Sequence, residues 1–194
     1  MLRWVTNALA IETPPGIDYV GLYQALQDHL LAEYASGRRV ALVIDEAQNL
    51  TVEALEELRM LTNINSGKDD LLQLVLVGQP ELRAKILRPE LQQFAQRIVA
   101  AYHLGTLGHS AAQGYIAHRM RTAGGTGEEF SPEAVSEIVS HSRGVPRLVS
   151  KLCDFCLVYG AMAEEHVISV DTVRQVLSDG VFITGFPEGE KAAE

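Results

Sequence analysis

Two adjacent carboxylates, Asp45 and Glu46, directly follow an uninterrupted apolar run at residues 40–44. Such a run of β-branched and aliphatic residues predicts a strand buried on both faces of a parallel sheet. The acids would then lie at the carboxyl edge, where open α/β sheets place their ligands. There one carboxylate can hold Mg²⁺ while the next orients an attacking water for phosphoryl transfer. By itself, the pair is equally consistent with a strand that ends in polar residues.

Three further side chains are candidates for the same chemistry. Gln79 follows a second apolar run, where its amide could reach a γ-phosphate or the attacking water, although such a residue more often caps the helix starting at Pro80. Arg97 precedes a third apolar run and could reach a neighbouring subunit's nucleotide; without context, a surface ion pair is the favoured reading. Arg147 opens a helix, where the dipole disfavours a cation, which indicates another role such as holding a phosphate.

The phosphate-binding loop that normally accompanies such acids, G-x-x-x-x-G-K-S/T, occurs nowhere in the sequence. Gly67-Lys68 lacks the earlier glycine and is followed by Asp69. Residues 124–127 contain no lysine, and residues 185–192 have the wrong spacing and no hydroxyl. The sequence therefore predicts a metal-binding acid at Asp45 without the loop that cradles a triphosphate.

Composition excludes several classes of protein. With 47% hydrophobic and 21% charged residues, the 194-residue chain is globular. A net charge of −9 disfavours a protein that grips nucleic acid by its phosphates. No apolar run approaches the ~20 residues that span a bilayer, and the first residues do not form a signal peptide, so we expect a cytoplasmic location. Cys153 and Cys156 form a lone C-x-x-C in an apolar helix, which favours buried core thiols over a redox or metal site.

Hydrophobic periodicity and breakers predict alternating helices and strands in the first half of the chain. The alternation indicates an α/β unit with a parallel three-layer sheet. The expected helices cover residues 2–10, 18–36 and 52–64, with shorter ones opening at Pro80 and Pro89, and the strands cover 39–45, 71–77 and 98–104. Thr51 is expected to cap the third helix.

Strands disappear after Gly105, and the remaining pattern is helical. The expected helices cover residues 110–123, with Ser110 as the cap, then 132–141, 146–163 and 171–177. We therefore expect an α/β domain at 1–106, a helical domain at 107–180 and a disordered tail at 181–194.

Several of these segments together resemble the ExeA-type AAA+ ATPases of bacterial secretion and pilus systems, over about residues 2–177. The segments that carry the resemblance are 40–50, 74–82, 96–98, 102–104 and 144–148. The resemblance implies an incomplete AAA+ sheet, made of the Walker B strand, the sensor 1 strand and the strand that follows, with a C-terminal helical lid.

The resemblance also assigns roles to individual residues. Asp45 and Glu46 correspond to Walker B, with Asp45 on the metal, and Gln79 occupies the sensor 1 position. Arg97 is the candidate arginine finger, and Arg147 corresponds to sensor 2. ATP and Mg²⁺ are the implied cofactors. The implied partners are other subunits of a homo-oligomer and an inner-membrane secretion or pilus component, through which the protein would associate with that membrane.

One departure from the family is large. Its members begin with a strand, a phosphate loop and a helix, and that strand lies between the segments matched here by 71–77 and 98–104. Without it, the two segments either lose their backbone partners or pair directly, and each buried unmet group costs on the order of 1–3 kcal/mol. We expect this chain to be a C-terminal piece of an ATPase, with impaired ATP binding on its own.

Two other functions remain open at this stage. The chain could be a non-catalytic interaction module, because the free edge of a sheet recruits strands from partners. It could also be an AAA+ regulator of DNA transposition, which the acidic net charge disfavours.

Overall fold

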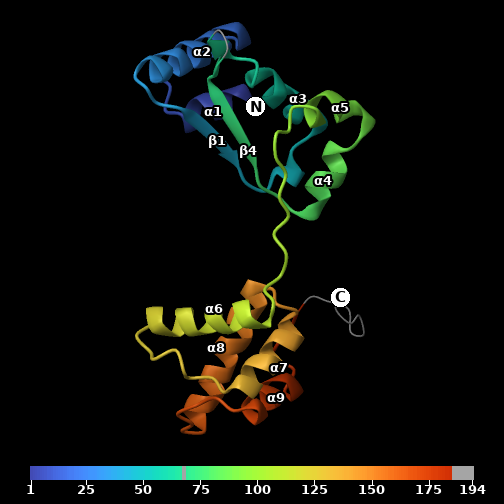
Figure 1. The fold of residues 1–194 in the computed structure, drawn as a ribbon. Coiled ribbons are helices and arrows are strands. Elements are labelled where there is room, and N and C mark those ends of the chain that lie inside the picture. The colour runs from blue at the N-terminus through green and yellow to red at the C-terminus, as the bar shows by residue number, and fades with distance from the viewer. Residues whose placement is uncertain (67–68, 185–194) are drawn as a thin grey trace. The chain divides into compact units, whose positions relative to one another are not determined.

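A computed structural model describes residues 1–66 and 69–184 of the chain (Figure 1). The chain forms two compact units, Met1–Tyr102 and a second one from His103 onward. The predicted tail lies outside the described residues from position 185. Within the described part, no helix is long and apolar enough to cross a membrane.

The first unit begins with helices α1 (Leu2–Ala8) and α2 (Tyr19–Ala35), followed by strand β1 (Val40–Ile44). Side-chain hydrogen bonds cap the starts of two helices, and of these caps Thr51 is the one predicted from the sequence. The Asp18 carboxylate accepts a hydrogen bond from the Gly21 N–H at 2.8 Å, and the Thr51 hydroxyl accepts one from the Ala54 N–H at 3.1 Å. The remaining elements are a 3-10 turn (Ala47–Asn49), α3 (Val52–Leu61), β2 (Asn65–Ser66), β3 (Asp69–Asp70), β4 (Leu72–Leu76), α4 (Pro80–Ile86), a second 3-10 turn (Pro89–Leu91) and α5 (Gln92–Ala95).

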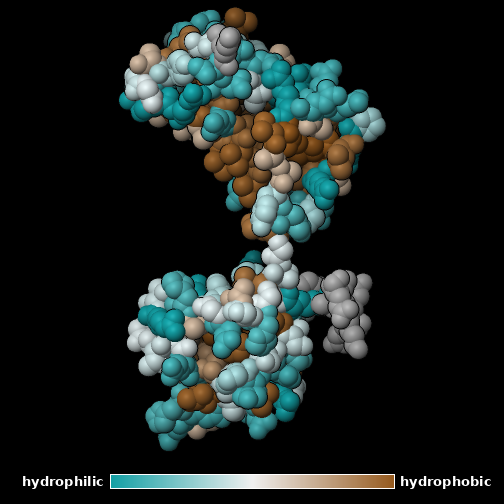
Figure 2. Space-filling model, viewed as in Figure 1, coloured by the Kyte–Doolittle hydropathy of each residue, from teal (hydrophilic) through white to brown (hydrophobic). Residues whose placement is uncertain are grey.

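Strands β1 and β4 pair in parallel, with Val40 opposite Leu72. On one face of this two-stranded sheet, side chains such as Leu42 pack with α1, α2 and α3 into a buried core. On the other face Val43 is 61% and Val75 45% exposed. Figure 2 shows a hydrophobic patch on the surface of the first unit. The prediction that β1 is buried on both faces is therefore wrong. Side chains alternate along a strand, and no described element covers the second face.

The expected strand at 98–104 does not form. After α5 the chain is extended without a sheet partner, and Val99 is 100% and Tyr102 89% exposed. Of the two outcomes expected for this segment, unpaired backbone is the one observed. A high β-propensity does not produce a strand when no neighbouring strand supplies hydrogen bonds. The α/β fold class with a parallel sheet is nevertheless confirmed by β1 and β4.

Between residues 103 and 184, the regular structure of the second unit is helical apart from an isolated β-bridge between Phe130 and Ile168. Its helices are α6 (His109–Thr122), α7 (Pro132–Ser142), α8 (Pro146–Met162) and α9 (Val170–Ser178), and they enclose a core around Leu152 and Val173. The predicted start of α6 is wrong by two residues, since Gly108 rather than Ser110 is its N-cap.

The two cysteines lie in this core as predicted, with Cys156 fully buried and Cys153 7% exposed. Burial raises the pKa of each thiol to about 12 from an ordinary value of 9.0. We expect iodoacetamide at pH 9.0, the ordinary pKa of the thiol, to label neither cysteine until the chain unfolds. Their contribution to stability should be complete below pH 9.0 and should decline as the pH rises toward about 12. Intact mass spectrometry measures the labelling by iodoacetamide. Stoichiometric labelling of the folded chain would contradict the prediction that both thiols are protected.

Candidate functional site

The acidic pair lies at the carboxyl end of β1, where the loop after β1 joins the end of β4. The Val77 N–H donates to the Ile44 carbonyl, and the Ala47 N–H donates to the Val77 carbonyl, each at 2.9 Å. These backbone bonds continue the parallel ladder beyond the strands. They hold the exposed side chains of Asp45 and Glu46 at the rim of the sheet, where the sequence predicted them.

The backbone of Glu46 is left-handed, with φ 51° and ψ 36°. This conformation is uncommon for a residue with a side chain and tends to occur at functional sites. The Asp45 carboxylate accepts a hydrogen bond from the Glu46 N–H at 2.8 Å, which stabilises the sharp change of direction. The turn therefore presents two carboxylates in succession, rather than continuing the strand and its alternation.

Gln48 is a residue of this site that the sequence did not reveal. Its side-chain Nε2 donates to the Glu46 carboxylate, while its Oε1 accepts from the Gln79 N–H at 3.1 Å. A Cβ on Gly78 would lie 2.7 Å from the Gln48 Oε1 and 3.2 Å from its backbone nitrogen, so this approach requires glycine. The available signal was a glycine directly after a strand, which often marks a close approach to other atoms.

Lys85 is a second residue that sequence reasoning missed. From α4, its Nζ donates to the carbonyl oxygens of Gln48 and Leu50, the latter at 2.8 Å. The ammonium thereby satisfies two carbonyls of the turn that follows the acidic pair. These hydrogen bonds consequently link helix α4 to the loop after β1.

Gln79 lies at the N-cap of α4, but its side chain makes no capping hydrogen bond. Its backbone N–H is the group bonded to Gln48, and its amide side chain is exposed. The structure thus brings Asp45, Glu46 and Gln79 to one rim of the sheet. The alternative reading of Gln79 as a side-chain helix cap finds no support.

The two candidate arginines lie in different units. Arg97 follows α5 in the first unit, is exposed, and forms none of the ion pairs found among the described residues. Arg147 is the second residue of α8 in the second unit and is also exposed. The surface ion pair considered for Arg97 is therefore not observed, and the roles assigned to both arginines stay predictions.

The donor set suits a magnesium ion shared with a phosphate rather than a metal held by protein alone. Nowhere in residues 1–66 and 69–184 do three or more His, Cys, Asp or Glu side chains cluster for a metal. Magnesium in phosphoryl-transfer sites takes one or two carboxylates and completes its shell with water and substrate phosphates. Asp45 at the rim fits that arrangement.

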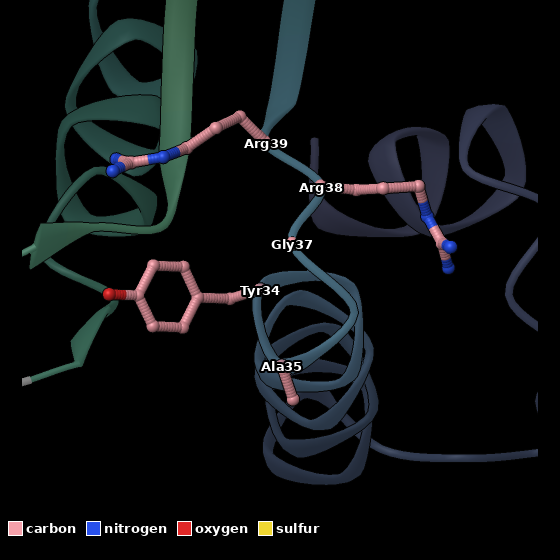
Figure 3. A pocket seen from close by; sticks show the side chains of 5 residues that line it. All are labelled: Tyr34, Ala35, Gly37, Arg38 and Arg39. Carbon is pink, nitrogen blue, oxygen red and sulfur yellow. The ribbon is translucent and has the colours of Figure 1, made fainter.

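An open pocket at the opposite end of β1 does not belong to this site (Figure 3). Arg38 and Arg39 point in opposite directions from its wall. Arg38 makes two bonds to Glu33, at 2.5 and 2.8 Å, while Arg39 lies 3.9 Å from Asp69 and over the ring of Tyr34. Its cations already have partners, and it adjoins the amino end of the strand.

Comparison with known proteins identifies relatives at the level of sequence. Residues 1–86 match the family described as AAA domain. Over 147 residues the chain is 42% identical to General secretion pathway protein A of Aeromonas hydrophila, an alignment covering 76% of this chain and 27% of that protein. The chain thus matches about a quarter of the length of this curated relative.

Solved structures with the same fold share less sequence. Cdc6p of Pyrobaculum aerophilum has a TM-score of 0.65 at 19% identity, with 93% of this chain and 49% of that chain covered. The Thermotoga maritima RuvB Holliday junction branch migration motor has a TM-score of 0.57 at 22% identity, with 84% and 52% covered. At these identities the likeness establishes the fold.

Proposed function

Since the chain belongs to the AAA+ ATPases and is related to a general secretion pathway protein A, we propose that it is an ATPase module of a bacterial secretion or pilus system. It would couple ATP binding and hydrolysis to assembly of that system. The observation that carries the proposal is the position of Asp45 and Glu46 at the carboxyl rim of β1, joined through Gln48 to the Gln79 loop. Open α/β sheets bind ligands at this rim.

Each residue at the rim has a role in this proposal. Asp45 would hold Mg²⁺, which neutralises charge on the phosphate oxygens of ATP when bound. Glu46 orients the attacking water and accepts its proton. The amide of Gln79 contacts the terminal phosphate or the water. Arg97 reaches the nucleotide of a neighbouring subunit in a homo-oligomer. Arg147, which lies in the helical lid, holds a phosphate of the nucleotide.

The 194-residue sequence contains no G-x-x-x-x-G-K-S/T loop. Backbone N–H groups and the lysine of that loop cradle the phosphates. Without them, we expect Mg·ATP to bind with a dissociation constant weaker than about 1 mM, equivalent to a free energy of only about −4 kcal/mol. Titration calorimetry measures this directly. Micromolar affinity would show that other residues replace the loop.

The function itself is tested by placing ahead of Met1 a strand, a G-x-x-x-x-G-K-S/T loop and a helix of AAA+ type. The fusion replaces the Met1 ammonium, which lies 3.0 Å from Glu57, but the Leu2 N–H still donates to Glu57 at 3.0 Å. The extended protein is expected to hydrolyse ATP, and a matched extension with the loop lysine changed to alanine is not. A folded extension that binds no nucleotide would contradict the proposal.

Partner and location are part of the same proposal. A role in secretion implies an inner-membrane component to which the module attaches. The net charge of −9 makes nucleic acid an unfavourable partner.

A non-catalytic interaction module is the second candidate, favoured by the exposed sheet face at Val43 and Val75 and by the unpaired segment 98–104. Apolar faces and open strand edges attract partner chains. Light scattering separates the two candidates when the extended protein is measured with and without ATP. Assembly that depends on ATP supports the ATPase, whereas assembly that is the same with and without ATP supports the interaction module.

A further inference from the structure

We propose that Gln48 is a positioning residue that couples the orientation of the Glu46 carboxylate to the position of the loop after β4. The inference rests on the proposed function, because it assigns Glu46 to the attacking water. In a single side chain, one end contacts the carboxylate that would orient water, and the other contacts the residue at the sensor 1 position. Glu46 and the Gln79 loop are thereby joined by one side-chain amide.

The two ends of the amide are not interchangeable. Nε2 has only donors, which suit the Glu46 carboxylate, and Oε1 has only acceptors, which suit the Gln79 N–H at 3.1 Å. A flipped amide would lose both bonds, because its oxygen would face the Glu46 carboxylate and its NH₂ group would face the Gln79 N–H. Both bonds therefore form or break with one orientation of the Gln48 side chain.

Neighbouring groups hold the backbone of Gln48 in place, so its side chain is the part that can move when the loop containing Gln79 moves. Its carbonyl accepts from Lys85, and the preceding residue, Ala47, is fully buried and bonded through its N–H to Val77. Gly78 leaves room for the side chain at a distance that any Cβ would obstruct. A displacement of residue 79 therefore reaches Glu46 through the Gln48 side chain, while the backbone of the turn stays in place.

In the proposed ATPase, this coupling makes the orientation of the Glu46 carboxylate depend on the contacts of the loop that contains Gln79. While the Gln79 N–H is bonded to Gln48, the carboxylate of Glu46 is held by Nε2. When a phosphate draws the loop away, Gln48 loses its fixed orientation and Glu46 is free to turn toward water. The alternative is that Gln48 links the two loops without coupling them. The hydrogen bond from the Gln79 N–H to Gln48 would then not depend on residue 46.

Amide exchange measured by ¹H–¹⁵N NMR on the full chain, without nucleotide, separates these readings. Gln48→Leu removes the acceptor and should accelerate exchange of the Gln79 N–H by about 3- to 10-fold, the range that one neutral hydrogen bond contributes. Glu46→Ala should also accelerate it and shift the Gln48 side-chain NH₂ resonances. Glu46→Gln retains an acceptor for Nε2, so it should preserve the wild-type exchange rate.

Two controls make the result specific. Gln73→Leu changes an exposed glutamine on β4 and should leave the Gln79 N–H unaffected. The Val77 N–H, which bonds to Ile44, should keep its exchange rate in every variant.

An unchanged Gln79 rate in Glu46→Ala would overturn the coupling, and so would equal acceleration at Val77, because the whole loop would then be opening. Because no nucleotide is present, failure of the coupling leaves the ATPase proposal standing. Loss of the ATPase proposal, in turn, is detected only by the nucleotide measurements on the extended protein.

Discussion

Glu46→Gln, introduced into the protein extended by a phosphate loop, is expected to hydrolyse ATP at least about 100-fold more slowly than the extended wild type. General bases contribute roughly 10²- to 10⁴-fold to a rate, and an amide cannot accept the proton of the attacking water. The substitution keeps the shape of the side chain and an oxygen that accepts from Gln48. Mg·ATP affinity should therefore change little. Phosphate release and calorimetry measure the two quantities separately.

Two further variants locate the effect. Asp45→Ala should weaken magnesium-dependent binding as well as hydrolysis, since Asp45 is the proposed metal ligand. Glu12→Gln removes the same charge from an exposed position in the same unit and should leave both quantities unchanged. Wild-type hydrolysis in Glu46→Gln would reject Glu46 as the residue that orients water.

Gly144→Ala is expected to be strongly destabilising for the second unit. Gly144 has φ +68°, and a Cβ there would lie 2.1 Å from the Leu107 carbonyl oxygen, an atom of the backbone. The Leu107 N–H also donates to the Gly144 carbonyl at 2.8 Å, so the two segments cannot separate without losing that bond. Together, backbone strain and overpacking should cost on the order of 3–5 kcal/mol.

Thermal unfolding followed by far-UV circular dichroism checks this, with a decrease of at least about 10 °C expected in the melting transition of the second unit. Trp4, the single tryptophan, lies in the first unit, so its fluorescence should report an unchanged transition there.

Two glycines in the second unit serve as controls. Gly180 has the same φ of +68° with no atom within 4 Å of an added Cβ, so Gly180→Ala should show the backbone strain alone, about 1–2 kcal/mol. Gly114, inside α6 and equally unobstructed, should become more stable by about 0.5–1 kcal/mol as alanine. If Gly144→Ala is no worse than Gly180→Ala, the Leu107 backbone must move aside at little cost.

Much of the fold could be predicted because its signals are local. Asp18, Thr51 and Ser131 each accept the hydrogen bond that begins a helix, and these bonds span only three residues. The resemblance to secretion-type AAA+ ATPases, read from short segments, is confirmed by the 42% identity. The acids were placed correctly at the end of β1 because a strand and its following turn are adjacent in the chain.

The errors and omissions concern groups whose partners are distant in sequence. Whether Val43 is buried depends on an element that would cover β1, and whether 98–104 becomes a strand depends on a neighbour with which to pair. Gln48 acquired its place only because β4 brings Gln79, 31 positions away, beside it.

By itself, then, the sequence determined which segments are helical, the α/β class, the family and the acids that begin the proposed chemistry, since all of these depend on composition and on near neighbours. The tertiary structure alone decided which face of the sheet meets water, which predicted strand stays unpaired, and how Glu46 is connected to the Gln79 loop. The reason is physical: burial and backbone pairing are completed by groups that only folding brings within hydrogen-bonding distance.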